Sequence, residues 1–369
     1  MHIHHRRSRA VVASALVVPA LLVSACSGDS PDDASSSAAI TVTDQRGKAV
    51  TLDGPANRIA SAVIPAPTII AAVDGSWDRI VGINASLLQA NQQGIISKIF
   101  PASTSTAVVA DRSFVPNMEQ ILSLEPDLVV QWGDMGDEVI DPIEQAGIPT
   151  VGLEYGTQDD LETWIALFGT AIGKADRATA IIDGMHAEAD AVREQVAALG
   201  AASPRGLSLS YTDESLSVST GADYAQDVFD MASVTNVAKD GQVSNGVVSA
   251  EQIIAWDPEV IFLSAFDTAT PQDVYDDPRL ADIAAVRDHR VYRSPLGVYR
   301  WQVPCAESPL YWNWVAALAY PGQYEVDLPA MMRQQITYLY SYDITDDDIA
   351  LILRTDINHR SASYDAVSR

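Results

Sequence analysis

The sequence predicts an α/β protein made of two doubly wound lobes that are joined by a single long helix. Short apolar strand patterns alternate with helical patterns over residues 40–158, and the alternation restarts over residues 201–369. Between these halves, residues 159–200 are rich in Ala, Glu, Leu and Ile at helical spacing. Two segments 132 positions apart, NMEQILSLEPDLVV at 117–130 and SAEQIIAWDPEVIF at 249–262, share four identical positions and six close substitutions. A match of this length predicts that both lobes contain the same helix–strand unit.

The strand patterns can be followed along each half. Residues 40–60 alternate apolar and polar residues and turn at 46–47, which predicts a hairpin leading into a buried strand at 59–63. The strings WDRIVGIN, LVVQW and GIPTVGLEY then predict strands of a parallel sheet covered by helices, as do GLSLSY, VIFLS and HRVYRSP in the second half. An apolar helical tail, from 309 to about 353, ends the chain. In the connecting segment Gly173 and Gly184 are candidate breaks, but a helix of about 25 residues would span roughly 37 Å.

The first 25 residues predict a secretory signal peptide. Three arginines precede the apolar run AVVASALVVPALLVSA, no acid is present, and the run is too short for a membrane span. The sequence VSAC at 23–26 resembles a bacterial lipobox, which implies lipid attachment at Cys26. Residues 26–39 are polar and lack large apolar side chains, so they predict a flexible tether. Export through the general or the twin-arginine route stays open.

Charge and composition exclude several classes of protein. The net charge is −26 and no Lys/Arg cluster follows the signal, so a nucleic-acid partner is not expected. Cys305 has no partner once Cys26 is acylated, and its role stays open. The histidines that survive processing, His186, His289 and His359, have no second ligand at metal-binding spacing. The fold must therefore be stabilised by a core, and roughly 330 residues suffice for two domains.

Each repeat predicts the same local structure. An N-cap residue, Asn117 or Ser249, begins a short helix, with a glutamine three positions later as a capping-box partner. A proline, Pro126 or Pro258, pushes the preceding residue out of the helical region, and a strand follows. Because ligands of doubly wound sheets bind beyond the carboxyl ends of strands, the residues after both strands are predicted to face a shared cleft between the lobes.

A resemblance follows from these motifs. In order after the lipobox, TVTDQRGKAVTL, NRIASAV, NMEQILSLEPDLVV, GIPTVGL and SAEQIIAWDPEVIF resemble the solute-binding proteins of ABC importers for iron-siderophores, haem and cobalamin. The resemblance covers nearly the whole mature chain. It implies a stiff interlobe helix, a ligand held between the lobes, and a monomer anchored by lipid to the outer face of the cytoplasmic membrane. It also implies that Glu119 and Glu251 form salt bridges with arginines on the two permease subunits.

Helix electrostatics offers another explanation for these two glutamates. An acid near a helix N-terminus is stabilised by about 0.3–1 kcal/mol wherever it stands in the first turn. Both repeats, however, keep glutamate at the second helical position. This agreement favours docking.

Candidate ligand contacts are aromatic and arginine side chains in loops that follow strands. They are Arg112, Phe114, Trp132, Tyr155, Tyr211, Tyr224, Phe266, Arg300 and Trp301. Aromatic rings cover flat chelates, and arginine pairs with carboxylate, catecholate or oxyanion groups. The resemblance implies a stacking role for Trp132 in cobalamin-binding relatives. The predicted ligand is an Fe(III)-siderophore that brings its own metal, so no cofactor is expected; cobalamin, haem and a molybdate-like oxyanion are the alternatives.

The sequence supports ligand capture for import better than two other functions. A secreted enzyme is disfavoured because SVSTG at 217–221 lacks the first glycine of G-x-S-x-G, and no phosphate loop is present. Acid-rich stretches such as DMGDE do not follow the spacing of a calcium loop. A lipoprotein that delivers ligand to a sensor remains an alternative. The sequence thus predicts a binding protein and no enzymatic activity.

Overall fold

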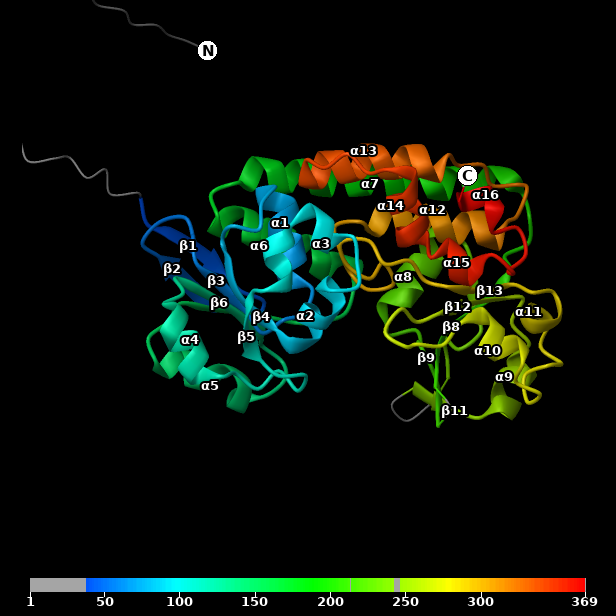
Figure 1. Ribbon diagram of the computed structural model, residues 1–369, viewed down its shortest axis with the longest axis horizontal. Helices are drawn as coiled ribbons and strands as arrows, with labels where there is room; N and C mark the ends of the chain where they lie inside the picture. The colour runs from blue at the N-terminus through cyan, green and yellow to red at the C-terminus, as the bar shows by residue number, and fades with distance from the viewer. Residues whose placement is uncertain (1–37, 213, 242–245, 369) are drawn as a thin grey trace, which may run out of the picture. The chain divides into compact units, whose positions relative to one another are not determined.

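The computed structural model describes residues 38–212, 214–241 and 246–368 (Figure 1). The predicted signal peptide at 1–25, Cys26 and nearly all of the tether at 26–39 lie outside the described residues. In the part of the chain that the structure describes, no helix is both long enough and apolar enough to cross a membrane.

The N-terminal half contains the predicted hairpin and a five-stranded parallel sheet. The hairpin strands are β1 (Ile40–Thr43) and β2 (Ala49–Leu52), which pair antiparallel. The sheet has the order β5-β4-β3-β6-β7, with β3 (Ile59–Ser61), β4 (Ile80–Asn84), β5 (Ala107–Ala110), β6 (Leu128–Trp132) and β7 (Thr150–Leu153). Strands β6 and β7 are buried along their whole length, as expected for parallel strands covered on both faces.

Short helices connect and cover these strands. They are α1 (Ala66–Asp74), α2 (Ala85–Asn91), α3 (Ile96–Ile99), the 3-10 helix η1 (Pro101–Thr104), α4 (Met118–Leu124) and α5 (Asp137–Gln145). Helix α1 is almost entirely buried, because it packs between the sheet and the longer helices that follow.

The C-terminal half contains a second, separate sheet of mixed direction. Its order is β11-β9-β8-β12-β13, and β10 pairs with β8 beside this path. The strands are β8 (Arg205–Tyr211), β9 (Leu216–Val218), β10 (Thr235–Asn236), β11 (Val247–Val248), β12 (Val260–Leu263) and β13 (Val291–Arg293). The interposed helices are α8 (Tyr224–Met231), α9 (Ala250–Trp256), α10 (Pro271–Tyr275) and α11 (Ala284–Arg287). Strands β9 and β11 are antiparallel to their neighbours, so this half repeats the helix–strand unit but not the all-parallel sheet of the first.

The segment predicted as one interlobe helix is two helices. They are α6 (Gln158–Ala171) and α7 (Ala175–Leu199), separated at Gly173, whose φ of 73° lies in the left-handed region. Gly184, the other candidate break, lies inside α7. Helix α6 packs on β1 and α1, whereas α7 contacts α1 at one end and α8 and α12 further along. Of these two helices, only α7, which has 25 residues, connects the two halves.

The C-terminal helices supply a second connection that the sequence did not predict. They are α12 (Ser308–Ala319), α13 (Leu328–Tyr340), α14 (Asp346–Leu353), α15 (Thr355–Asn358) and α16 (Asp365–Ser368). Helix α12 is buried throughout, as the apolar tail predicted. Helix α13 runs beside α7 and reaches back to pack on α1 (Figure 1). Arg177 on α7 joins the three helices, because it donates to the carbonyl oxygens of Ala72 and Tyr338.

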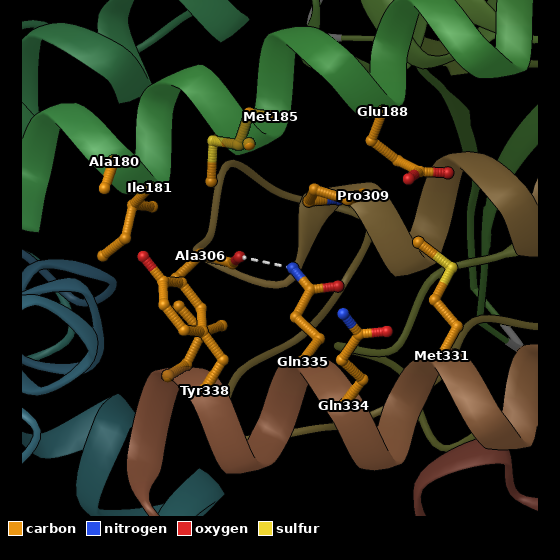
Figure 2. Close-up of a pocket in the computed structure, with 12 residues that line it drawn as sticks. Ala180, Ile181, Met185, Glu188, Ala306, Pro309, Met331, Gln334, Gln335 and Tyr338 are labelled. Atoms are coloured by element: carbon orange, nitrogen blue, oxygen red, sulfur yellow. Dashed lines mark hydrogen bonds between the residues drawn. The ribbon is translucent and has the colours of Figure 1, made fainter.

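A groove of about 190 Å³ lies between α7 and α13 (Figure 2). Met185 on α7 and Met331 on α13 face it, and Gln335 closes it from below by donating to the carbonyl oxygen of Ala306. Hydrogen bonds link the two helices near their ends, from Arg177 to the carbonyl oxygen of Tyr338 and from Gln195 to that of Glu325, just before α13. The fold class is confirmed, with two helices joining the halves instead of one.

Candidate ligand-binding cleft

A cavity of about 320 Å³ lies where strands of both halves end. Its walls are Ile64, Pro65, Phe114, Trp132, Asp134, Met135 and Tyr155 from the first half, and Phe266, Tyr299 and Val303 from the second. Trp132 is the last residue of β6, and Phe266 follows the end of β12. The cavity therefore occupies the position predicted from the carboxyl ends of parallel strands.

Trp132 is the centre of an aromatic cluster on the wall formed by the first half. Its ring meets the rings of Phe114, Tyr155 and Trp164 edge to face, with centroid distances of 6.0, 5.9 and 6.0 Å. Each such pair is favourable because the positive edge of one ring meets the negative face of another. The indole N–H of Trp132 is buried and has no hydrogen-bond partner among the described residues, so the centre of the cluster carries an unsatisfied donor.

Phe114 is held in a backbone conformation that bulky residues avoid. Its φ is 65°, in the left-handed region, which costs on the order of 1–3 kcal/mol for such a residue. The surrounding loop enforces this conformation. The carboxylate of Asp111 accepts the backbone N–H groups of Ser113 and Val115, at 2.8 and 3.1 Å, and Gln131 donates to the carbonyl oxygen of Phe114 at 3.0 Å. The strain is retained at a cavity wall.

A second cavity, of about 300 Å³, adjoins the first and shares Tyr155, Phe266 and Val303 with it. Hydroxyl and amide groups dominate its lining, from Ser208, Ser210, Ser217, Ser219, Ser264 and Gln302. The serines of β8 alternate with buried leucines, so the hydroxyls share one face of the strand. The cleft thus has an aromatic wall in one half and a hydroxyl-rich wall in the other.

Three arginines gather beside the second wall. The guanidinium of Arg300 lies over the ring of Phe266, 4.3 Å from its centroid. Arg293 donates to the carbonyl oxygens of Ala269 and Asp267. Burial, with the nearby charges of Arg293 and Arg300, lowers the pKa of Arg354 to about 10. Each of the three keeps one buried N–H without a hydrogen-bond partner among the described residues, but none of them lines either cavity, whose charged lining residues are Asp134 and Asp223.

The structure brings together most of the predicted ligand contacts. Phe114, Trp132, Tyr155 and Phe266 line the larger cavity, and Tyr224 lines the adjoining one. Tyr224 is nevertheless almost fully buried, and its hydroxyl donates to Ser308 at 2.7 Å. These residues remain predictions as ligand contacts, now with a shared location.

Four predicted residues do not line either cavity. Arg300 stacks on Phe266 but is not part of either lining. Arg112 is exposed and donates to Gln89 at 2.8 Å. Tyr211 stands an even number of residues from the buried leucines of β8, so it points to the same face of the strand. Its hydroxyl donates to Asp277. Trp301 is fully buried, where its N–H donates to Glu307. Tyr299, two residues earlier, lines the larger cavity instead.

The sequence reasoning missed the serines and two of the three arginines. The serines could have been found, because GLSLSY alternates apolar and hydroxyl residues in a strand that ends at the cleft. Arg293 is the last residue of β13 and could have been found in the same way. Arg354 carries no local signal, since it follows α14 and reaches the others only through the packing of the C-terminal helices.

The glutamates of the two repeats are both exposed, in the first turns of α4 and α9. The predicted N-caps are confirmed, because Asn117 accepts from the N–H of Gln120 at 3.1 Å and Ser249 accepts from that of Gln252 at 3.3 Å. The side chain of Gln120, however, donates to Ser123 instead of returning to the cap. Hydrogen bonds from its own backbone and from Ser249 lower the pKa of Glu251, so it is charged at neutral pH.

A family model described as periplasmic binding protein matches residues 65–295, which span both sheets and the cleft between them. The chain belongs to the periplasmic binding protein family. The resemblance stated from the sequence is therefore confirmed. Proteins of this family are extracytoplasmic, bind small ligands and work with ABC transporter permeases.

Relatives of known structure or name agree with this assignment. A periplasmic solute binding protein from Veillonella parvula superposes with a TM-score of 0.78 and 34% identity, over 87% of this chain and 98% of that one. The molybdate-binding protein MolA of Haemophilus influenzae is 23% identical over 84% of this chain and 93% of its own length. The Fe(3+)-citrate-binding protein YfmC of Bacillus subtilis is 25% identical over 76% and 87%. This periplasmic binding protein thus has binding proteins, not enzymes, as relatives.

Proposed function

We propose that this periplasmic binding protein is a lipoprotein that captures an Fe(III)-siderophore and delivers it to an ABC permease. The observation that carries the proposal is an aromatic cavity whose wall residue Phe266 is stacked by Arg300, a guanidinium with one buried N–H that has no partner among the described residues. A ferric chelate with carboxylate, catecholate or hydroxamate donors offers apolar faces and anionic oxygens together. The metal arrives with the ligand, so the protein needs no cofactor of its own.

The two walls of the cleft suit different parts of such a ligand. The edges and faces of Trp132 and Tyr155 cover flat apolar surface. Arg300 offers a charge-assisted hydrogen bond to an anionic oxygen, held in place by its stacking on Phe266. The hydroxyls of Ser208 on β8 and Ser217 on β9 can donate to carbonyl oxygens of the chelate backbone, whereas that of Ser210 is already donated to Asp267.

The size of the cleft also favours a chelate over a small ion. The adjoining cavities measure about 320 and 300 Å³, within the range of pockets for organic ligands. An oxyanion of five heavy atoms would leave most of this volume to water. A molybdate-like oxyanion is still the second candidate, because the arginines alone would suit it and MolA is among the relatives.

Delivery requires contact with the permease and the membrane. We infer that Glu119 and Glu251, one on each half and both exposed, form the ionic contacts with two permease subunits. The lipid at Cys26 would hold the protein at the outer face of the cytoplasmic membrane, with the protein acting as a monomer. A sensor that receives the ligand instead of a permease would leave the binding chemistry unchanged.

Tryptophan fluorescence tests the ligand. The purified protein is titrated with a ferric hydroxamate, a ferric catecholate, haem, cobalamin and molybdate. We expect stoichiometric quenching by a ferric chelate, without turnover, and a much smaller quench in Trp132→Phe. Quenching by molybdate or cobalamin alone would show that the siderophore assignment is wrong. Leu351→Gln, an exposed change on α14 away from the cleft, is the matched control.

A further inference from the structure

One loop of the second half supplies residues to both cavities of the cleft. It is the stretch 294–307 between β13 and α12, and the structure describes all of it. Tyr299 and Val303 line the larger cavity, and Gln302 and Val303 line the adjoining one. The stretch forms neither a helix nor a regular strand, so its shape must come from other contacts.

The buried carboxyl group of Glu307 holds this loop from the inside. Glu307 is 1% exposed, and its Oε1 accepts the backbone N–H of Val298 at 3.0 Å. Its Oε2 accepts the indole N–H of Trp301. The two donors stand on either side of Tyr299 and Arg300, so one carboxyl group fixes both ends of the turn that carries these residues.

Gly297 shows how closely the carboxyl group packs on the backbone of the loop. A Cβ atom at this position would lie 1.7 Å from Oε2 of Glu307 and 2.5 Å from the indole nitrogen of Trp301. No side chain fits there unless the carboxyl group moves, so this close approach requires glycine. The N–H of Gly297 also donates to the carbonyl oxygen of Tyr299 at 3.0 Å, which tightens the same turn.

The outer side of the turn is tied to the segment that follows β12. Gln302 accepts the backbone N–H of Ala265 at 2.6 Å. Arg300 stacks on Phe266, the next residue of that segment. A shift of the turn would therefore move Phe266 as well as Tyr299, and both line the larger cavity.

The groups around Glu307 do not offset a charge on its carboxyl group. The titratable groups that face it are Tyr340 on α13 and Cys305 in its own loop. Burial raises the pKa of both groups, so both are neutral near pH 7. Burial also raises the pKa of Glu307 to about 7, against its hydrogen bonds. Ionisation therefore favours any conformation of the loop that lets water reach the carboxyl group.

We propose that Glu307 is a positioning residue for ligand capture, which holds the turn at 297–303 against the cleft only while its carboxyl group carries a proton. Glu307 lines neither cavity and acts through Tyr299, Arg300 and Gln302. The inference rests on the proposed function, because it concerns how the same cleft is kept ready for its ligand. By linkage, loss of the proton weakens binding, and bound ligand raises the proton affinity of Glu307.

Calorimetric titration with a ferric hydroxamate whose own charge is constant between pH 6 and pH 8 tests the inference. The wild type should bind about ten-fold more weakly at pH 8, because a group with a pKa of about 7 is mostly protonated at pH 6 and mostly ionised at pH 8. Glu307→Gln should bind about three-fold more weakly than wild type at pH 6, since its amide nitrogen cannot accept an N–H, and equally at both pH values.

Glu194→Gln makes the same chemical change at an exposed site on α7 and is the matched control. It should keep the pH dependence of the wild type. A pH dependence that persists in Glu307→Gln, or that is absent from the wild type, would overturn the inference.

A second arm needs no ligand. Hydrogen exchange of a peptide that covers 294–307 is followed in the ligand-free protein and corrected for the pH dependence of the intrinsic exchange rate. We expect its protection to fall about ten-fold from pH 6 to pH 8 in the wild type but not in Glu307→Gln, through a local opening that low urea does not accelerate.

The urea dependence separates a positioning role from a general one. If low urea accelerates exchange of this peptide as much as that of β4, Glu307 supports the whole fold and the positioning role is wrong. If the ferric hydroxamate does not bind, the ligand proposal fails, and the exchange of the loop peptide still decides the role of Glu307.

Discussion

The two repeats share one skeleton. Glu125 and Asp257 end α4 and α9 in the left-handed region, with φ values of 46° and 41°. In each half an arginine, Arg58 or Arg205, donates to the carbonyl oxygen of that residue. The backbone N–H of the same arginine donates to the acid that follows the proline. The duplication has therefore kept the contacts that join helix to strand.

The same skeleton carries different side chains where the repeats meet the cleft. Trp132 and Ser264 are equivalent positions, so one half presents a ring where the other presents a hydroxyl. Phe114 and Gly246 are also equivalent, and their φ values are 65° and 71°. The backbone requirement is shared, but only the first half places an aromatic ring there. The exposed glutamates of the repeats are equivalent and the cleft residues are not, which suits the proposed two-subunit partner and an asymmetric ligand.

The two exposed glutamates are the feature that both repeats share, and reversing both of their charges should have the largest effect on uptake. We expect Glu119→Lys/Glu251→Lys to reduce uptake to background, because each like-charge contact repels the permease. Ligand affinity, measured by tryptophan quenching, should not change. Wild-type uptake in this variant would show that both glutamates only stabilise the N-termini of their helices.

A pH dependence of stability is expected from one buried carboxyl group of the second half. Burial raises the pKa of Glu307 to about 7, against hydrogen bonds from Trp301 and Val298. The stability from neutral Glu307 is fully present below about pH 4.5 and is lost as pH rises through 7, by about 3 kcal/mol in total. Urea unfolding at pH 5 and pH 8 measures this loss. Glu307→Gln should reduce the difference between the two pH values, and an unchanged difference would contradict the assignment.

Replacing a cleft residue of the first repeat by its equivalent in the second should have the next largest effect, on ligand affinity. Trp132→Ser copies the second repeat into the first and removes the centre of the aromatic cluster. We expect ligand affinity to fall about 10- to 100-fold, as loss of aromatic contacts worth 1.4–2.7 kcal/mol would give. Calorimetric titration with the ferric chelate that quenches the wild type measures the change. Trp132→Phe, which keeps a ring, should lose less.

The positive-φ positions should give the smallest changes. Phe114→Gly relieves strain and loses ring contacts, so its free energy of unfolding should change by about 1 kcal/mol or less while ligand affinity falls. Gly246→Ala adds strain and brings a Cβ to 2.8 Å from the carbonyl oxygen of Val218, so it should cost about 1–3 kcal/mol without affecting the ligand. Chemical denaturation measures both. Equal destabilisation by the two variants would contradict the proposed division of roles.

Local sequence patterns predicted those parts of the molecule that local physics controls. Asn117 and Ser249 begin helices because they cap them, and Trp132 and Phe266 face the cleft because strands end there. Trp301 was misplaced because its loop turns inward onto the buried carboxylate of Glu307, six residues later, and no periodic pattern in the loop indicates that turn. The return of α13 to α1 was missed for the same reason, since it depends on contacts more than 250 residues apart in the chain.

The paired helices α7 and α13 have a consequence for assembly at the membrane. Two helices, linked to each other and to α1 by Arg177, join the halves where a single helix was expected. Under the proposed docking, these helices would set the spacing between Glu119 and Glu251 before any partner is met. Binding through the second glutamate would then be an intramolecular step at high effective concentration, so two weak contacts would give useful avidity. A break in either helix would lower that avidity without altering a single interface residue.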